Sequence, residues 1–185
     1  MSAKRTWVGS GKRTWVGVFS MVAGLLGGCS GGGDPALDKD VVTSLPSGDA
    51  TGSDADGDYQ VQLYTSACSG DCKYTYLGFD VSGCDVGHTD SATLTLTQVD
   101  GHLQADVNGS SLLVTRFEGG LWQDGSFDIG GYSTQQAGDI EVTARATGSL
   151  SGDTVTGTAK AHAWGSVDGS GVNCTATYDL TGSRQ

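Results

Sequence analysis

Five cysteines are the residues of this 185-residue chain best suited to chemistry. Cys68, Cys72, Cys84 and Cys174 lie in the C-terminal two thirds, whereas Cys29 stands apart near the N-terminus. Structural zinc sites use closely paired cysteines, and here only the first two of the four lie close together. The spacing therefore predicts no metal site. Four cysteines that can pair completely indicate two disulfides in an oxidising compartment.

The pairing of these four cysteines has three possible solutions. We favour Cys72–Cys84, because the two residues would face each other across the hairpin-like segment 73–83. Cys68–Cys174 would then join the first and last strands of the domain. That second bond would close a loop of about 105 residues and stabilise the fold by roughly 4–5 kcal/mol on the chain-entropy estimate.

Other side chains offer little catalytic chemistry. His88, His102 and His162 are far apart in the sequence and have no metal-ligand spacing, so we expect surface histidines. The acidic stretch DADGD at 54–58 is similar to part of a calcium loop, but Leu63 occupies the position where an EF-hand needs a bidentate glutamate. We therefore predict a protein that is not an enzyme and holds no metal.

An apolar stretch ends abruptly at Cys29. Residues 14–28 are uncharged, four basic residues and no acidic residue precede them, and glycine, serine and aspartate follow. A basic start, a short apolar region and small residues before the cut are typical of a secretory signal peptide. The stretch is shorter than the roughly 20 residues that cross a bilayer. We predict that residues 1–28 are removed.

The residues Leu26-Gly27-Gly28-Cys29 resemble the lipobox of bacterial lipoproteins. The resemblance implies that Cys29 becomes the mature N-terminus and carries a diacylglycerol on its sulfur and an acyl chain such as palmitate on its amino group. Two or more such chains give a stable membrane anchor. By analogy with the family, Ser30 after the cysteine favours the outer membrane. The alternative is an ordinary signal peptide that leaves Cys29 as a free thiol.

The predicted mature chain is strongly acidic. All 21 acidic residues and only six basic ones lie downstream of Cys29, which gives a net charge of −15. This charge argues against nucleic acid as a partner, and against binding to anionic lipid by charge alone. Residues 29–57 are rich in Gly, Ser and Asp and contain both prolines, so we expect a flexible acidic tether before a domain at 58–185.

The clearest structural signal is a hairpin over residues 92–109. Asp100-Gly101 is a typical two-residue turn, and apolar and polar residues alternate on both sides of it. One face of the hairpin is then mainly apolar and the other wholly polar, as in a sheet with one solvated side. The turn predicts that Leu94 faces Val107, Leu96 faces Ala105 and Gln98 faces Leu103.

A second hairpin turns at Gly152-Asp153. A slip of one residue would expose its apolar side chains, so the pattern fixes the register. The same register sets Arg145 opposite Lys160, a like-charge pair that we expect to be relieved by fraying or a bulge, or by a bound anion. The predicted inward pairs are Val142 with Ala163, Ala144 with Ala161, Ala146 with Ala159, Gly148 with Gly157, and Leu150 with Val155.

These hairpins predict an all-β fold in which eight or nine antiparallel strands form an up-and-down meander that closes into a small barrel. Closure removes exposed strand edges. Such a barrel is distantly similar to lipocalins and avidins, and a β-sandwich is the alternative. The segments at 124–127, 151–159 and 174–184 also resemble the Gly/Thr-rich all-β domains of Gram-negative envelope lipoproteins.

One stripe of the predicted barrel interior has unusually small side chains. Either bulky neighbours such as Trp122, Phe127 and Tyr178 fill the space, or the barrel keeps a cavity. The stripe consists of Ala144, Ala146, Gly148, Gly157, Ala159 and Ala161.

Together these observations predict a non-enzymatic envelope protein, anchored by lipid on Cys29, that displays an acidic β-domain in a structural or interaction role. The membrane is the partner that the anchor implies. The alternative is a lipocalin-like carrier of a small apolar ligand, for which we expect a connected cavity of several hundred cubic ångströms. The acyl groups on Cys29 are the only expected cofactor.

Overall fold

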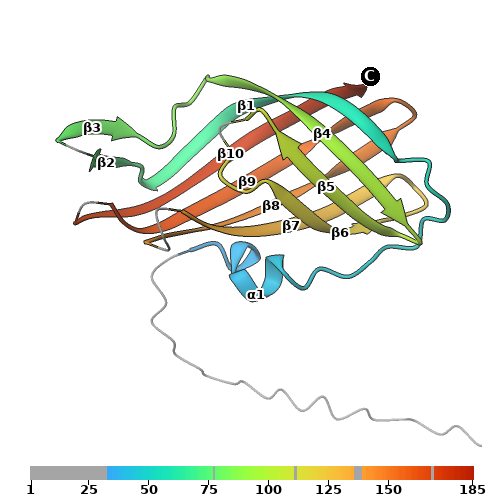
Figure 1. Ribbon diagram of the computed structural model, residues 1–185, viewed down its shortest axis with the longest axis horizontal. Helices are drawn as coiled ribbons and strands as arrows, with labels where there is room; N and C mark the ends of the chain where they lie inside the picture. The colour runs from blue at the N-terminus through green and yellow to red at the C-terminus, as the bar shows by residue number, and fades with distance from the viewer. Residues whose placement is uncertain (1–32, 77, 111, 136–138, 168) are drawn as a thin grey trace, which may run out of the picture. The chain divides into compact units, whose positions relative to one another are not determined.

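The computed structural model describes residues 33–76, 78–110, 112–135, 139–167 and 169–185. Eight antiparallel strands close a barrel in the order β1-β10-β9-β8-β7-β6-β5-β4, which confirms the predicted fold class over the sandwich alternative (Figure 1). The barrel strands are β1 (Gly57–Asp71), β4 (Thr89–Val99), β5 (His102–Asn108), β6 (Arg116–Leu121), β7 (Ser126–Gln135), β8 (Ile140–Ser151), β9 (Thr154–Val167) and β10 (Ser170–Arg184).

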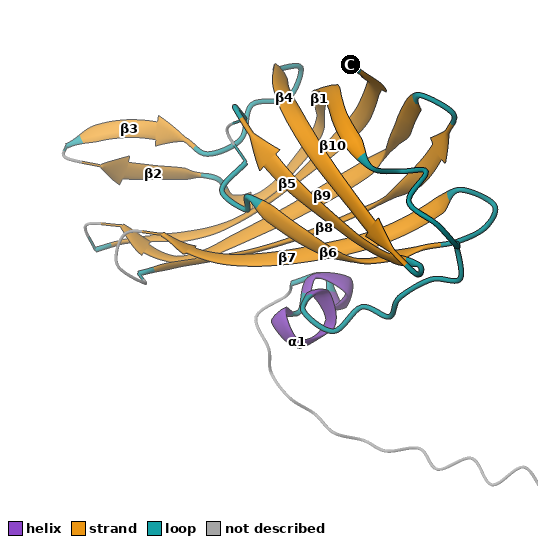
Figure 2. Cartoon of the chain, turned by 45° about the vertical axis from the view of Figure 1, so that its right-hand side comes forward, coloured by secondary structure: helices purple, strands orange, loops and turns teal. Residues whose placement is uncertain are grey.

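Two further strands interrupt the meander between β1 and β4. β2 (Lys73–Tyr76) and β3 (Phe79–Ser82) form a separate two-stranded sheet. Both ribbon views show this hairpin projecting beyond one end of the barrel (Figures 1 and 2). The sequence pattern predicted a hairpin-like segment there, and the structure sets it outside the barrel wall.

The turns between strands determine the registers that the sequence predicted. Asp100 and Gly101 both have positive φ, 47° and 78°, as a type I′ turn requires, and the β4–β5 pairs are those predicted. At the β8–β9 turn Gly152 has φ of 57°, and the five predicted β8–β9 pairs also form. The turn between β6 and β7 is made by residues 122–125, where Gly125 has φ of 82°.

Alternate residues of each barrel strand point inward and pack as one apolar core. In β1, Val61 is fully buried and Leu63 is 2% exposed, as predicted for inward positions. Tyr59 precedes them and is also fully buried. Because the alternation continues around all eight strands, the barrel encloses one core.

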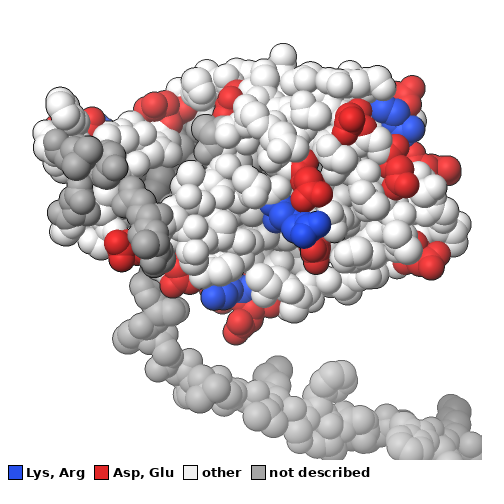
Figure 3. All heavy atoms as spheres, in the orientation of Figure 1, with Lys and Arg blue, Asp and Glu red and all other residues white. Residues whose placement is uncertain are grey.

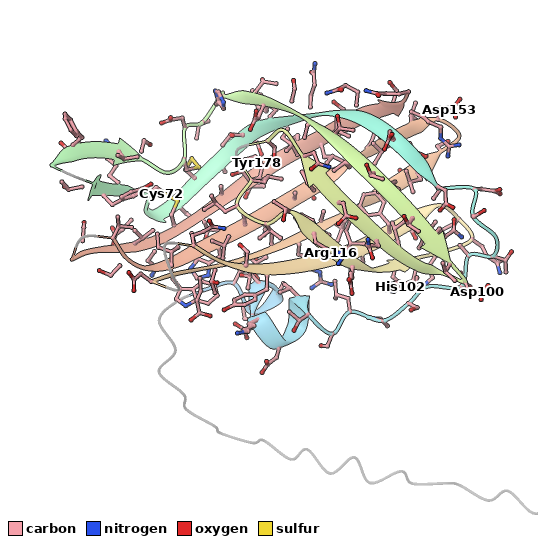
Figure 4. All side chains as sticks on the ribbon, in the orientation of Figure 1. Cys72, Asp100, His102, Arg116, Asp153 and Tyr178 are labelled. Atoms are coloured by element: carbon pink, nitrogen blue, oxygen red, sulfur yellow. A yellow bond between two sulfur atoms is a disulfide. The ribbon has the colours of Figure 1, made fainter. Side chains whose placement is uncertain are left out.

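The two ends of the barrel differ, and we name them for what closes them. The mouth is the end from which β2 and β3 project and where Cys72 lies (Figure 4). The plugged end is the opposite one, which contains the turns labelled by Asp100 and Asp153 in Figure 4. The chain alternates between the two ends with every strand.

Residues 34–50 form a strap along the outside of the barrel. The strap contains a short 3₁₀ helix (Pro35–Leu37) and the α-helix α1 (Lys39–Val42), which lies against the wall on the side of β7 (Figure 2). Leu37 and Val42 are 2% and 1% exposed. The prediction of a flexible tether up to residue 57 is therefore wrong for residues 34–57. The physical reason is that two apolar side chains suffice to dock a short segment when the wall beneath offers a matching recess.

That recess is made by glycine. A Cβ atom built on Gly130 of β7 would overlap the Val42 carbonyl and lie 2.9 Å from its Cα. Further along, Gly48 N–H donates to the Gly101 carbonyl at 2.9 Å and Ala50 N–H to the Leu121 carbonyl at 3.0 Å. The strap thus reaches the plugged end, which residues 50–56 then cross before β1 begins.

The predicted like-charge pair is relieved by partners, without fraying or a bulge. Arg145 and Lys160 lie opposite each other within an unshifted register. The Arg145 guanidinium donates two hydrogen bonds, at 2.8 and 2.5 Å, to Asp128 on β7. Lys160 Nζ lies 3.1 Å from the carboxylate of Asp34 in the strap. The Asp128 hydrogen bonds raise the pKa of the Arg145 guanidinium, so each of the two cations has an acidic partner and Arg145 stays charged.

Candidate ligand site at the barrel mouth

The middle of the barrel is filled. It holds a cavity of about 40 Å³ with a wholly apolar lining that includes Ala146 and Ala159 of the predicted small stripe. Phe127 takes up the space left by Gly148, because a Cβ there would lie 2.8 Å from the tip of its ring. Gly157 is pressed against β8, since its Cβ would overlap the Thr147 carbonyl. Small residues in this part of the stripe are therefore matched by bulky or close neighbours.

A larger pocket, of about 270 Å³, opens at the mouth. Ala161 of the predicted stripe lines it, as does Ala163, and both are only half-buried. Small side chains where β8, β9 and β10 reach the mouth leave this volume unfilled, and Leu112 and Leu113 border it. The remaining lining residues are Tyr74, Ser82, Gly83, Ile140, Val142, Val172, Cys174, Ala176 and Tyr178. Ala144, the other member of the stripe, is 2% exposed in the core.

Two disulfides hold the β2–β3 hairpin at this pocket. They join Cys68 to Cys84 and Cys72 to Cys174, so two disulfides are confirmed but the predicted pairing is wrong. In the hairpin Cys72 lies opposite Gly83, whose N–H donates to the Cys72 carbonyl at 2.7 Å. Cys84 is one residue further along and does not face Cys72 across the hairpin.

The barrel register explains which cysteine reaches β10. Gly70 of β1 pairs with Cys174, and the chain then folds back so that the Cα of Cys72 lies 4.5 Å from that of Cys174. A register shift between Thr65 and Ala67 changes the alternation of β1 before its cysteine. The sequence analysis paired Cys72 with Cys84 across segment 73–83 and left Cys68 to join the first and last strands, which assigned the wrong partner to each cysteine.

Tyr178 supplies the pocket with a polar group. It is half-buried and lines the pocket. Burial raises the pKa of this phenol, and the negative charge of Asp90 raises it further. The hydroxyl therefore stays neutral well above pH 7 and can donate one hydrogen bond to a bound molecule.

The histidines do not come together in the structure. His88 is exposed near the mouth, His102 lies at the plugged end beside Asp100 (Figure 4), and His162 stacks on Trp164 outside the barrel, with ring centroids 5.0 Å apart. Sulfur atoms of three cysteines lie within 4.8 Å of one another, but all belong to the two disulfides and offer no thiolate to a metal.

A second hollow, of about 500 Å³, lies at the plugged end and was not predicted. Trp122 lines it together with Gln98, a buried amide whose oxygen accepts a hydrogen bond of 3.2 Å from Ala55 N–H. The sequence contained one signal for this hollow, because the predicted register sets the polar side chain of Gln98 on the apolar face opposite Leu103. The sequence analysis did not anticipate that the Gln98 amide accepts a hydrogen bond from residues 50–56, which cross the plugged end.

Comparison of the chain with protein-family models, with curated proteins and with solved structures gave no match. Cys29 and the segment 26–29 that resembles a lipobox lie outside the described residues. Among the described residues, no helix is long and apolar enough to cross a membrane.

Proposed function

We propose that this chain is a non-enzymatic, lipid-anchored protein of the bacterial cell envelope whose barrel binds a small, mainly apolar ligand at its mouth. The observation that supports binding is the pocket of about 270 Å³ between the barrel rim and the β2–β3 hairpin. Pockets for drug-sized molecules have volumes from about 300 Å³ upward. The ligand is therefore small, such as a single aromatic ring system or a short acyl chain.

The filled middle of the barrel favours one of two forms of this role. A lipocalin-like carrier needs a deep cavity, and the space below the rim is only about 40 Å³. Binding is consequently shallow, with part of the ligand covered by the hairpin through Tyr74. A purely structural domain would gain nothing from leaving the rim unfilled, since a packed rim is more stable.

The charge of the domain further restricts the ligand. With a net charge of −15 downstream of Cys29, the domain disfavours anions. The neutral Tyr178 hydroxyl favours a ligand with one hydrogen-bond acceptor. No described histidine lines the pocket. Two tyrosines, Tyr74 and Tyr178, line it, and no lining residue could act as a base beside them. This composition supports binding over catalysis.

The anchor and the location complete the proposal. Acyl chains on Cys29 would hold the protein on a membrane, and Ser30 favours the outer one. The acidic surface supports the absence of a nucleic-acid partner. The tethered partner is thus the membrane, with the barrel presented beside it.

Binding can be tested with N-phenyl-1-naphthylamine, a neutral apolar dye that fluoresces in apolar sites. We expect saturable binding to the full chain, and a loss of affinity of about tenfold or more in Ala163→Trp, which fills the mouth. Ser166→Trp is the matched control, because it adds the same bulk to an exposed position of the same strand. Equal affinity in all three proteins, or no saturable binding to the wild type, would overturn the pocket.

The anchor is tested separately by metabolic labelling with a palmitate analogue in wild-type cells and in cells carrying Cys29→Ala. We expect label in the wild type only. Label in both, or in neither, would refute acylation at Cys29 without bearing on the dye experiment.

A further inference from the structure

The N-terminal end of the strap contacts strand β9. The Asp34 carboxylate lies 3.1 Å from Lys160 Nζ, and the Ala36 carbonyl accepts a hydrogen bond of 3.5 Å from Arg145. The described chain begins one residue earlier, at Gly33. If Cys29 is acylated, as the proposed function holds, its Cα is four residue steps from that of Gly33, and these steps can span at most about 14 Å. The side of the barrel around Lys160 therefore has to lie near the bilayer.

The outer surface on this side has few acidic residues. Strands β9 and β10 contain one acidic residue between them, Asp179, of the 21 in the chain. We call their outward surface the β9–β10 face. It consists of Thr156, Thr158, Lys160, His162 and Trp164 on β9, and Asn173, Thr175, Thr177 and Asp179 on β10.

Other surfaces carry more negative charge. The turns of the plugged end include Asp100, Asp124 and Asp153, and the mouth has Asp80 and Asp85. On the wall opposite this face, seen from the front in Figure 3, strands β4 to β6 contain three acidic residues and one basic residue, Arg116. Anionic lipid headgroups would repel these surfaces, whereas the β9–β10 face is close to neutral.

Aromatic side chains also favour the β9–β10 face. Trp164 is half-buried and stacks on His162. Tyr64, on the adjacent strand β1, is 45% exposed and pairs with Asp179. Tryptophan and tyrosine are the residues enriched at membrane–water interfaces, where an apolar ring and a polar tip are both satisfied. Lys160 can extend its apolar stem along the same surface.

We propose that the β9–β10 face of the lipid-anchored protein lies against the headgroups of the bilayer. The occupant of this face is a phospholipid surface, brought there by the short connection to Cys29 and tolerated by the low charge of the face. The mouth then opens along the membrane plane, and the acidic wall of β4 to β6 faces the aqueous phase.

The two tryptophans downstream of Cys29 provide a matched test, since Trp164 lies on the face and Trp122 at the plugged end. In the acylated protein, which lacks residues 1–28 and with them Trp7 and Trp15, Trp122→Phe reports on Trp164 and Trp164→Phe on Trp122. Each protein is reconstituted into phosphatidylcholine–phosphatidylglycerol vesicles that contain brominated phosphatidylcholine. We expect several-fold stronger quenching of Trp164. Equal quenching, or stronger quenching of Trp122, would overturn the proposed face.

A negative charge added to the β9–β10 face gives a second test of the proposal. Thr177→Glu adds a carboxylate to the β9–β10 face, and Thr97→Glu adds the same group to the exposed side of β4. We expect only the first to lower the quenching of Trp164. Equal effects of the two variants would contradict the assignment.

Failure of the anchor can be told apart from failure of the face. If the protein is not acylated, it will not float with vesicles, and the proposed anchor is wrong. Cys29, the one cysteine outside the two disulfides, can then be coupled to a maleimide phospholipid. The same comparison of Trp164 with Trp122 tests the face in that conjugate.

Discussion

The two ends of the barrel are closed by different physical means. At the plugged end the chain covers itself: residues 50–56 cross the opening, the fully buried Tyr59 accepts hydrogen bonds from Arg184 at 3.1 and 2.7 Å, and Gln98 N–H donates to Asp56 at 2.6 Å. At the mouth the β2–β3 hairpin buries little, since Phe79 at its tip is 75% exposed. Two disulfides attach it to the barrel instead.

This difference shows where covalent bonds are needed. A segment that buries apolar side chains and pairs its backbone groups is held by packing and hydrogen bonds, as the strap and residues 50–56 are. A small exposed hairpin cannot offset the entropy of ordering its own chain. Disulfides lower that entropy in the unfolded state and leave the pocket beneath the hairpin open.

The largest expected effect is therefore the loss of the long-range disulfide. Cys72–Cys174 joins residues 102 apart in the sequence, and Cys68–Cys84 joins residues 16 apart. On the chain-entropy estimate, the Cys72→Ser/Cys174→Ser variant loses about 4.7 kcal/mol and the Cys68→Ser/Cys84→Ser variant about 3 kcal/mol. Urea unfolding followed by circular dichroism measures both losses.

The same two variants also test the contrast between the ends. We expect each to weaken binding of the naphthylamine dye at the mouth, while Trp122 fluorescence at the plugged end keeps its native emission before unfolding. A larger loss of stability from the short-range pair, or a changed Trp122 emission in the folded variant, would show that the ends are not independent.

The next effect concerns the strap, which packing alone holds. Gly130→Ala introduces a Cβ that overlaps the Val42 carbonyl, so the helix α1 must shift away from β7. Overpacking of this kind costs about 1–3 kcal/mol. Gly171→Ala is the control, because a Cβ there meets no atom within 4 Å. Urea midpoints of the two variants should differ clearly, and similar midpoints would mean that the strap does not depend on this contact.

The parts of the fold that sequence predicted well rest on local patterns. In the hairpin turning at Asp100-Gly101, alternation and turn type both act within a few residues, and the register was correct throughout. The same holds for the hairpin at Gly152-Asp153. A slip there would expose every inward side chain, so few alternatives compete with the predicted pairing.

The parts that sequence missed depend on distant contacts. The pairing of Cys72 with Cys174 depends on where β1 leaves β10, because Gly70 lies opposite Cys174 and Cys72 is two residues further along the chain. The strap has the composition of a disordered linker, and its docking depends on Gly130, nearly ninety residues away. Of the candidate site, the sequence predicted the small residue Ala161 but not that segment 73–83 borders the same pocket.

A smaller effect, this time an increase in the free energy of unfolding, is expected when Thr143 of β8 is replaced. Thr143 is fully buried, and its hydroxyl has no hydrogen-bond partner among the described residues. An unsatisfied buried hydroxyl is destabilising, so Thr143→Val should raise the free energy of unfolding by about 1 kcal/mol. Thr147→Val, on the exposed surface of the same strand, should change it little. A destabilised Thr143→Val protein would indicate that the hydroxyl has a partner, such as a buried water.

The smallest expected effect is a pH dependence of the strap. The Ala36 N–H and then Lys160 hold the pKa of the Asp34 carboxyl below its usual range. A lowered folded pKa means that the stabilisation is present above the unfolded pKa, near 4, and is lost as the pH falls below it. The Asp34 side chain is 33% exposed, so solvent screening limits the effect to below about 1 kcal/mol.

Asp34→Asn isolates this contribution, because asparagine can still accept the hydrogen bond from Ala36 N–H but carries no charge for Lys160. We expect urea midpoints of the variant and the wild type to differ slightly at pH 7 and to converge once the pH has fallen below the lowered folded pKa of Asp34. A difference that persists unchanged at low pH would assign the effect to the cap geometry. The strap would then be held at Lys160 by hydrogen bonding, and the charge of Asp34 would add nothing to its docking on β9.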